Sequence, residues 1–258
     1  MIPYPNISPN IVRIGPVAVR WYGMMYLIGF ASSYFLVQCQ IKKRHLSLHK
    51  DFMESLYSYI VLGLLVGARL GYVVFYDFSA YMRSPLEILA VWHGGMSFHG
   101  GLLGAVVSGI LCCKRFGVDI WKVSDVVIVT APIGLGFGRL GNFINGELYG
   151  RPTDVPWAMV FPAGGPVPRH PSQLYEIFLE GIVLFTVLWK LKDKQLRPGI
   201  LSSLFFILYG LFRFFVEFFR EPDPQLGLVL GPFTMGQILS GSMMLLGAAM
   251  FYVRRKDA

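Results

Sequence analysis

Long apolar segments follow one another along the chain, and short connections between them carry most of the charge. Each segment is about 20 residues long, the length that an α-helix needs to cross roughly 30 Å of hydrocarbon. This pattern predicts an all-α, polytopic membrane protein. The seven predicted transmembrane helices cover approximately residues 17–41, 52–76, 94–113, 120–140, 173–190, 199–219 and 234–253.

Glycines recur at four-residue spacing in two of these segments. Such spacing lines one face of a helix with small residues and lets two backbones approach closely. We therefore expect close helix packing at these positions, which are Gly63, Gly67 and Gly71 in the second helix and Gly100 and Gly104 in the third.

The composition agrees with a membrane protein. Of the 258 residues, 54% are hydrophobic and 15% are charged, and the mean hydropathy is +0.54. Soluble domains carry about 25% charged residues, so this chain has too few to cover a soluble globule of its size. We expect residues 1–258 to form a single transmembrane domain.

Basic residues are distributed unequally between the two sides of the predicted helices. One side holds most of the lysines and arginines, and such connections face the cytoplasm. The N-terminus is then outside and the C-terminus is cytoplasmic. Membrane orientation thereby explains the net charge of +8, and no nucleic-acid partner is expected. The cytoplasmic set is Lys42, Lys43, Arg44, Lys50, Lys114, Arg115, Lys122, Lys190, Lys192, Lys194, Arg197, Arg254, Arg255 and Lys256, and the outer set is Arg13, Arg20, Arg83, Arg151, Arg169 and Arg220.

The longest connection covers residues 142–172 and lies on the outer side. It is dense in Pro and Gly and lacks the pattern of a separate domain. We expect it to form a small ordered head over the membrane surface.

The cysteines and histidines do not predict a metal site. Cys39, Cys112 and Cys113 lie inside apolar segments, where cysteine is ordinarily a small apolar packing residue. His93 and His99 are six residues apart, a spacing unsuited to one helical face, and they lack nearby acidic or cysteine partners. We expect no metal ion and no organic cofactor.

Four polar residues interrupt the sixth predicted helix at steps of four, four and three, which places them on one stripe: Tyr209, Arg213, Glu217 and Arg220. One interpretation is an internal ion pair between Arg213 and Glu217, with Arg220 reaching the outer interface. The other is that the stripe faces a wet or anionic cavity. We favour the second, because ionisable groups inside transmembrane helices are expensive and by default mark function.

The segment Gly134–Gly150 contains a second polar group at the outer end of the fourth predicted helix. Its glycines match G-x-G-x-x-G, but the strand–turn–helix context of a dinucleotide site is missing. What remains is Arg139 and Asn142, followed by Asn145 and Glu147. The alternatives are helix-end capping and a site where Arg139 and backbone N–H groups approach a phosphate, and we favour the phosphate site.

His99 precedes two glycines at the outer start of the third predicted helix, so a large substrate could approach its ring. Histidines at membrane surfaces are as often interfacial polar residues as bases, and both interpretations stay open. At the start of the fifth helix we expect Ser172 to cap the helix, and Glu176 and Glu180 lie one turn apart.

In this topology, both arginines and the histidine lie near the outer leaflet. Two cations and one possible base suit a phosphate-bearing lipid better than a channel filter or a redox centre. Two alternatives are a transporter for an anionic substrate, which would place polar residues at mid-membrane depth in repeated halves, and a non-catalytic lipid-binding subunit.

These residues together resemble the prolipoprotein diacylglyceryl transferase family of bacterial inner membranes. The resemblance covers nearly the whole chain. It rests on WYG at 21–23, HGG at 99–101, GRLGNFINGELYG at 138–150, HPSQLYE at 170–176 and YGLFRFFVEFFREPD at 209–223.

The resemblance implies transfer of the sn-1,2-diacylglyceryl group from phosphatidylglycerol to the lipobox cysteine of a prolipoprotein, next to its signal peptide. A thioether would form and glycerol phosphate would leave. The oligomeric state stays open. The resemblance also assigns roles to the residues that match the family motifs. Arg139 and Arg213 would hold the lipid phosphate, and His99 would be the candidate base. The residues lining the site would be Tyr22, Asn142 and Glu147, and the stripe that begins at Tyr209 would be completed by Glu217 and Arg220.

Overall fold

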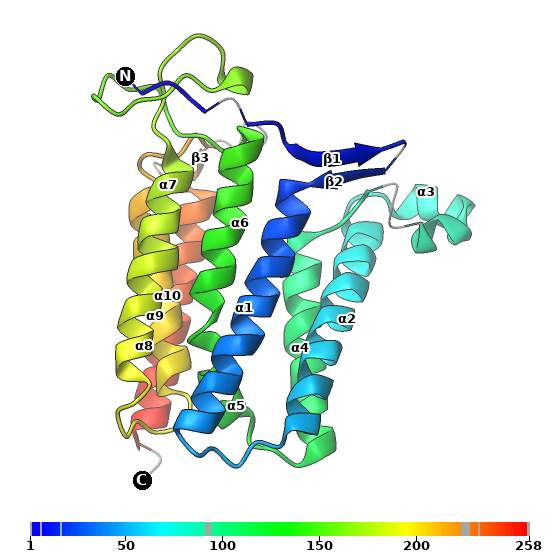
Figure 1. Cartoon of the computed structure of the whole chain (residues 1–258), viewed down its shortest axis with the longest axis vertical. Helices are drawn as coiled ribbons and strands as arrows, with labels where there is room; N and C mark the ends of the chain where they lie inside the picture. Colours follow the sequence, from blue (N-terminus) through cyan, green and yellow to red (C-terminus); the bar gives the residue numbers. More distant parts are fainter. Residues whose placement is uncertain are drawn as a thin grey trace. The chain divides into compact units, whose positions relative to one another are not determined.

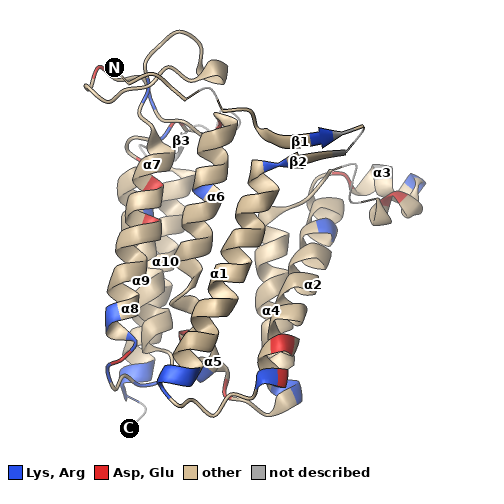
Figure 2. Cartoon of the chain, in the orientation of Figure 1, with Lys and Arg blue, Asp and Glu red and all other residues tan. Residues whose placement is uncertain are grey.

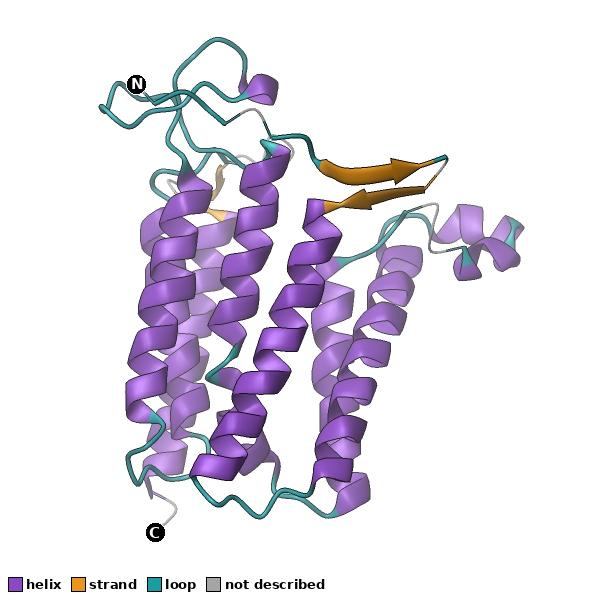
Figure 3. Cartoon of the chain, in the orientation of Figure 1, coloured by secondary structure: helices purple, strands orange, loops and turns teal. Residues whose placement is uncertain are grey.

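The computed structural model describes residues 2–5, 7–15, 17–90, 94–222, 228–231 and 233–256 (Figure 1), so His93 lies outside the described residues. The chain divides into two compact units, which are considered separately. Unit 1 consists of Met1–Arg44 and Ser124–Ala258, and unit 2 consists of His45–Val123. Both units are mostly helical (Figure 3), which confirms the helical fold class. The single transmembrane domain stays a prediction.

Unit 1 contains the first predicted helix and the predicted helices from the fourth onward. α5 (Ile120–Ile128) runs from unit 2 into unit 1. The other helical elements of unit 1 are α1 (Trp21–Lys43), α6 (Ala131–Asn145), the 3₁₀-helix η3 (Pro162–Gly164), α7 (Ser172–Glu176), the π-helix η4 (Ile177–Val183), α8 (Leu184–Leu191), α9 (Ile200–Val216) and α10 (Met235–Lys256).

Glycines allow the helices of unit 1 to approach closely around α6. A Cβ atom on Gly29 of α1 would lie 3.2 Å from the Cα of Gly134 in α6. On the other side of α6, a Cβ on Gly181 of η4 would lie 3.2 Å from the Cα of Gly136. Such contacts leave little room for side chains. α6 is therefore packed tightly between α1 and η4.

The apolar residues of unit 1 face both inward and outward. A small core buries Val129, Leu184 and Leu188 together with neighbours from α9. Many large apolar side chains point outward instead, including Phe178, which is 57% exposed, and Leu245, which is 74% exposed. An apolar exterior of this kind is unfavourable in water and suits hydrocarbon.

Unit 2 is a pair of long helices with a short connection. Its elements are α2 (Lys50–Phe75), α3 (Phe78–Arg83), the 3₁₀-helix η1 (Pro85–Leu89) and α4 (Phe98–Phe116). A Cβ on Gly104 of α4 would overlap the carbonyl oxygen of Gly63 and lie 2.9 Å from the Cα of Gly67. The predicted packing of these glycines is confirmed.

A buried arginine ties the segment before α4 to α2. Arg69 of α2 donates through Nε to the carbonyl of Ile88 at 2.9 Å, and the Ser97 N–H donates to the Ala68 carbonyl at 2.8 Å. Ser97 also caps α4, since its Oγ accepts from the Gly100 N–H at 3.2 Å. The other carbonyls that accept from Arg69 are those of Glu87, Ala90, Gly94 and Gly95.

Two antiparallel hairpins in unit 1 were not predicted. One joins β1 (Asn10–Ile14) to β2 (Val17–Arg20), and the other joins β3 (Leu228–Leu230) to β4 (Phe233–Thr234). Each strand has five residues or fewer. Alternation over so few positions gives a weak strand signal.

Helix is present at all seven predicted positions, but a smaller number of helices is long and apolar enough to cross a membrane. Among the described residues these are α1, α2 and α10, and α5 with α6 adds a fourth if the pair, bent by 43°, counts as one span. α9 has 17 residues, and the fifth predicted helix changes from α to π and back. The seven crossings stay a prediction.

Basic residues lie at one end of unit 1, where α1, α8 and α10 have their charged termini (Figure 2). Lys43, the last residue of α1, lies 3.7 Å from Asp193 after α8. Arg254 of α10 donates to the Pro198 carbonyl before α9 at 2.9 Å. Three of the predicted basic connections thus meet at one end of this unit.

The connection between α6 and α7 has a small core of its own. Phe143, Met159 and Phe161 are buried there and pack against Tyr4 and Tyr149. The Tyr4 hydroxyl donates to the Phe143 carbonyl at 2.6 Å. The connection begins at 146 rather than 142 because α6 continues to Asn145.

Replacement of Gly104 by Ala is expected to lower the free energy of unfolding by about 1–3 kcal/mol, because the added methyl group collides with α2 backbone. Thermal unfolding in detergent micelles measures the effect. Gly109→Ala, on the same helix, is the control, since its Cβ would lie 3.9 Å from the nearest atom, Ile60 Cγ1. Equal stability of the two variants would contradict the packing interpretation.

Candidate active site

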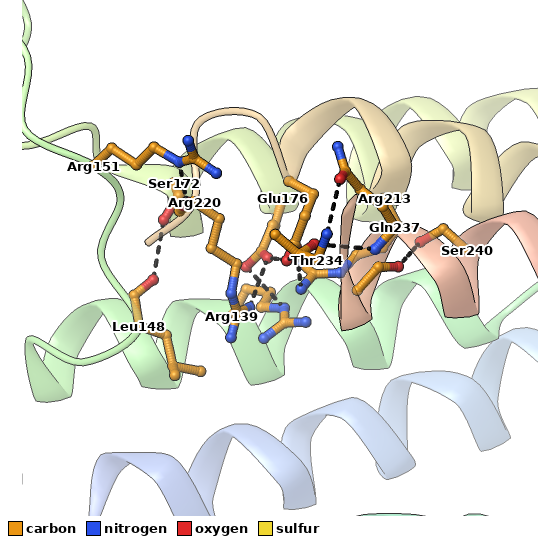
Figure 4. Close-up of polar contacts among 12 residues, drawn as sticks. Arg139, Leu148, Arg151, Ser172, Glu176, Arg213, Arg220, Thr234, Gln237 and Ser240 are labelled. Carbon is orange, nitrogen blue, oxygen red and sulfur yellow. Dashed lines mark hydrogen bonds and ion pairs between the residues drawn. The ribbon is translucent and has the colours of Figure 1, made fainter. Parts of the chain in front are cut away.

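A buried carboxylate lies at the centre of the polar residues of unit 1. Glu176 ends α7, and its side chain is 0% exposed. Its Oε2 lies 3.0 Å from Nε of Arg139, and its Oε1 binds Nη1 of Arg213 and lies 3.2 Å from Nη1 of Arg220 (Figure 4). Three guanidinium groups therefore converge on one carboxyl group.

The three arginines come from different parts of the chain. Arg139 lies in the middle of α6, Arg213 lies near the end of α9, and Arg220 lies in the turn after α9. Arg139 is the most exposed of the three, with 20% of its side chain accessible compared with 14% for Arg213 and 10% for Arg220. All three side chains are thus mostly buried.

The loop after α6 holds the turn after α9 and the start of α7. The Arg151 N–H donates to the Phe219 carbonyl and its Nε donates to the Arg220 carbonyl, both at 2.9 Å. Gln173 Nε2 donates to the Glu147 carbonyl at 2.7 Å. Hydrogen bonds to backbone carbonyls thus hold α7, which carries Glu176, and the turn after α9, which carries Arg220.

Ser172 does not cap the fifth helix as predicted. The N-cap residue is Pro171, and Ser172 is already helical. Its hydroxyl donates to the Leu148 carbonyl at 3.0 Å (Figure 4). The hydroxyl therefore joins α7 to the loop after α6.

Glu217 connects the cluster to α10. Its Oε2 lies 2.9 Å from Nη2 of Arg213, which is the internal ion pair of the interpretation that was not favoured. Its Oε1 accepts from the Thr234 hydroxyl at 2.9 Å, and the same hydroxyl accepts from the Gln237 N–H at 3.2 Å. Glu217 therefore fixes one face of Arg213 while Glu176 binds the other.

Asn142 and Glu147 form a second polar group beside the cluster. Glu147 Oε1 accepts from Nδ2 of Asn142 at 2.8 Å and from Nδ2 of Asn145 at 3.2 Å. Tyr22 of α1 packs against Gly141, where a Cβ would lie 2.8 Å from the Tyr22 ring. These three predicted site residues lie on α1, on α6 and just after α6.

Tyr209 completes the stripe on α9 one turn before Arg213. Its ring stacks on Phe205 at 5.6 Å between centroids. Ion pairs of Glu176 and Glu217 join Arg213, Glu217 and Arg220, and a site role for Tyr209 stays a prediction.

Glu176 carries more of the site than was predicted from the sequence. Glu176 was noted for its spacing from Glu180, and neither was predicted as a site residue. The available signal was the presence of two carboxylates inside an apolar segment, which is costly unless both have a role.

His99 lies in unit 2, within the first turn of α4, and its side chain is exposed. Its ring packs edge-on against Phe98 at 5.6 Å between centroids. The cluster around Glu176 belongs to unit 1, so the role of His99 as a base stays a prediction.

Within the described residues, no three His, Cys, Asp or Glu side chains are placed to hold a metal ion. That no metal or cofactor is needed stays a prediction.

Comparison with known proteins identifies the family. The sequence matches the prolipoprotein diacylglyceryl transferase family over residues 9–253. This chain belongs to that family. The match agrees with the resemblance seen in the sequence motifs.

Close relatives extend over nearly the full chain, and each is named phosphatidylglycerol–prolipoprotein diacylglyceryl transferase. The protein of Desulfotalea psychrophila is 52% identical, with 97% of this chain and 94% of that protein covered. Those of Geobacter sulfurreducens and Bordetella parapertussis are 51% and 53% identical, with 96% and 97% of this chain and 95% and 97% of those proteins covered.

In this diacylglyceryl transferase family member, Glu176→Gln is expected to lower the free energy of unfolding by about 3–5 kcal/mol, because it removes the carboxylate that separates three buried guanidinium groups. Chemical unfolding in detergent micelles measures this change. Glu54→Gln is the control and should stay within about 0.5 kcal/mol, because Glu54 is exposed and its ion pair with Lys50, at 3.5 Å, lies at the surface. A Glu176→Gln variant as stable as the parent would show that the cluster does not hold the unit together.

Proposed function

We propose that this protein transfers the diacylglyceryl group of phosphatidylglycerol to the cysteine thiol of a prolipoprotein. The observation that carries the proposal is the near full-length identity to proteins named for this activity. The motif residues of unit 1 add a physical reason, since they bring three guanidinium groups to one buried point.

The reaction needs stabilisation of negative charge. The thiol sulfur bonds to the glyceryl carbon, the carbon–oxygen bond to phosphate breaks, and its electron pair stays on the phosphate oxygen. The product is a phosphate monoester with more negative charge than the diester. Cationic groups held in place in a low-dielectric site stabilise this growing charge more than the ground state.

Arg139 and Arg213 are the proposed phosphate ligands. Both already point toward one carboxylate, so they are oriented for an anion before any lipid binds. A phosphate oxygen would share or replace the contacts that Glu176 makes with them. Because the side chains do not need to reorganise, more of their binding energy remains available in the transition state.

The acceptor thiol must lose its proton. A free cysteine has a pKa of about 8.5, so at neutral pH the thiol is mostly protonated and benefits from a base or from a positive field. His99 is the proposed base. The alternative is that the arginines alone lower the thiol pKa and that His99 is structural. We propose that Tyr22, Asn142, Glu147 and Tyr209 line the lipid site beside these groups.

We further propose seven membrane crossings in a bacterial inner membrane, with the N-terminus and residues 146–171 outside and the C-terminus in the cytoplasm. The gathering of basic termini at one end of unit 1 supports this orientation. Arg213 lies in the last turn of α9, at the opposite end of that helix, and it contacts the same carboxylate as Arg139, which favours a site toward the periplasmic leaflet.

Incubation of the purified protein with phosphatidylglycerol and a lipobox peptide tests the activity directly. Mass spectrometry should show a peptide heavier by one diacylglyceryl group and the release of glycerol phosphate. A peptide of unchanged mass would contradict the transferase. Movement of the lipid across a vesicle membrane without peptide modification would instead indicate a transporter.

Arg139→Ala and Arg213→Ala are each expected to reduce kcat/KM by about 100-fold or more, because each removes a charge that stabilises the leaving phosphate. The peptide assay measures the loss, and thermal unfolding checks that the variants fold. Arg115→Ala is the control, since Arg115 contacts the Tyr59 hydroxyl at an exposed position of unit 2. Normal turnover by either variant would remove the phosphate role from that arginine.

His99→Asn is expected to lower kcat at neutral pH while leaving the KM for phosphatidylglycerol close to the parent value, because a base acts on the thiol rather than on the lipid. The pH dependence of turnover measures the change, and activity should recover at alkaline pH as the thiol ionises on its own. Near-parental turnover at neutral pH would assign His99 a structural role.

A further inference from the structure

Glu180 is a buried carboxylate that the proposed chemistry does not use. It lies in the π-helix η4, its side chain is fully buried, and neither carboxylate oxygen accepts a hydrogen bond from any residue that the structure describes. Asp125 is another buried carboxylate in the same unit and serves as the comparison. It accepts hydrogen bonds from the N–H groups of Gly199 and Ser202 at 2.7 and 2.8 Å and from the Ser202 hydroxyl at 2.7 Å. Since unpartnered buried polar groups are rare and costly, Glu180 requires an explanation.

The packing of unit 1 places Glu180 next to the arginine cluster. Gly181 follows it and lies against Gly136 of α6, so that the two backbones approach closely at this point. Arg139 lies three residues after Gly136, on the same face of α6. Glu176 lies four residues before Glu180. The close approach of η4 and α6 therefore brings Glu180 into the field of the cluster.

The charged and titratable groups that act on Glu180 are those of the site. Glu176 lies on the same helical segment as Glu180, and Arg139 lies on α6. The others are Arg213 and Tyr209 of α9 and Arg220 after α9. π-helical turns are rare and occur often at functional sites. Glu180 thus shares the environment of the proposed phosphate ligands without contacting them as Glu176 does.

The charges of this cluster balance only if Glu180 is ionised while the site holds no lipid. The three guanidinium groups of Arg139, Arg213 and Arg220 carry three positive charges. Glu176 and Glu217 supply two negative charges, and Glu180 supplies the third. A phosphodiester adds one more negative charge, which is expensive in a low-dielectric site unless another charge is lost.

Among the three carboxylates, Glu180 loses least on accepting a proton. Glu176 and Glu217 both bind guanidinium groups directly, and Glu217 also accepts from the Thr234 hydroxyl. Protonation of either would weaken contacts that hold the arginines. Protonation of Glu180 would break no hydrogen bond to a described residue.

We propose that Glu180 takes up one proton when the anionic headgroup of phosphatidylglycerol binds to Arg139 and Arg213. The carboxylate becomes a neutral carboxylic acid, the proton comes from solvent, and the net charge of the buried cluster stays unchanged. Glu180 is then a positioning residue, because it acts on the lipid through the charge available at the arginines and does not touch it. This inference rests on the proposed function.

The experiment measures proton uptake on lipid binding. The full chain in detergent micelles is titrated with short-chain phosphatidylglycerol by isothermal calorimetry, in buffers of different ionisation enthalpy. The parent protein should take up about one proton per headgroup, and its affinity should fall by up to about tenfold per pH unit above the pKa of the empty site. Glu180→Gln should bind the lipid with no proton uptake and with a flat pH dependence.

Two further variants keep the result interpretable. Glu180→Asp retains a titratable carboxyl group and should restore proton uptake, which a purely structural role would not predict. Asp125→Asn removes the matched buried carboxylate and should leave proton uptake at the parental value. If Glu180→Gln does not fold, two other results would still overturn the proposal. One is a folded Glu180→Asp variant that takes up no proton on lipid binding, and the other is a parent protein that takes up none.

Failure of this inference is separable from failure of the proposed function. A parent protein that binds phosphatidylglycerol without taking up a proton, or a Glu180→Gln variant with parental uptake, contradicts the role of Glu180 alone. A parent protein that binds no phosphatidylglycerol and modifies no peptide contradicts the transferase.

Discussion

The organisation of unit 1 depends on one carboxylate that lies among three guanidinium groups. Arg139, Arg213 and Arg220 come from separate parts of the chain, and at close range in a medium of low dielectric constant they would repel one another strongly. Glu176 lies between them and converts repulsion into attraction. The same arrangement leaves cations of fixed orientation at the point where an anionic headgroup would be bound.

The sequence predicted the parts of this site that depend on local spacing. Tyr209, Arg213, Glu217 and Arg220 were placed on one stripe because residues three and four apart share a helical face. The contact between Arg213 and Glu217 follows from that spacing and is present at 2.9 Å. Arg139 was found because it is a charged group within an apolar segment.

The parts that were missed depend on how helices pack against one another. The second partner of Arg213 is Glu176, which is 37 residues away in the chain, and no periodicity in the sequence links the two. Ser172 has the residue type of a helix cap but bonds to the Leu148 carbonyl. The short hairpins and the π-helix are likewise selected by tertiary contacts, since their segments carry no distinctive pattern.

The π-helix η4 has a consequence for how this chain tolerates changes in length. A π-turn holds one residue more than an α-turn, and deletion of one residue within Ile177–Val183 would let the segment relax into a regular α-helix. Because the turn accommodates its extra residue, the helix after the deletion would keep nearly its present rotation around the helix axis. Leu184 and Leu188 would still face the core, and Glu176 would keep its arginines. A single missing codon in this segment would therefore disturb the fold less than one in the regular helix α9, where each lost residue rotates everything after it by about 100°.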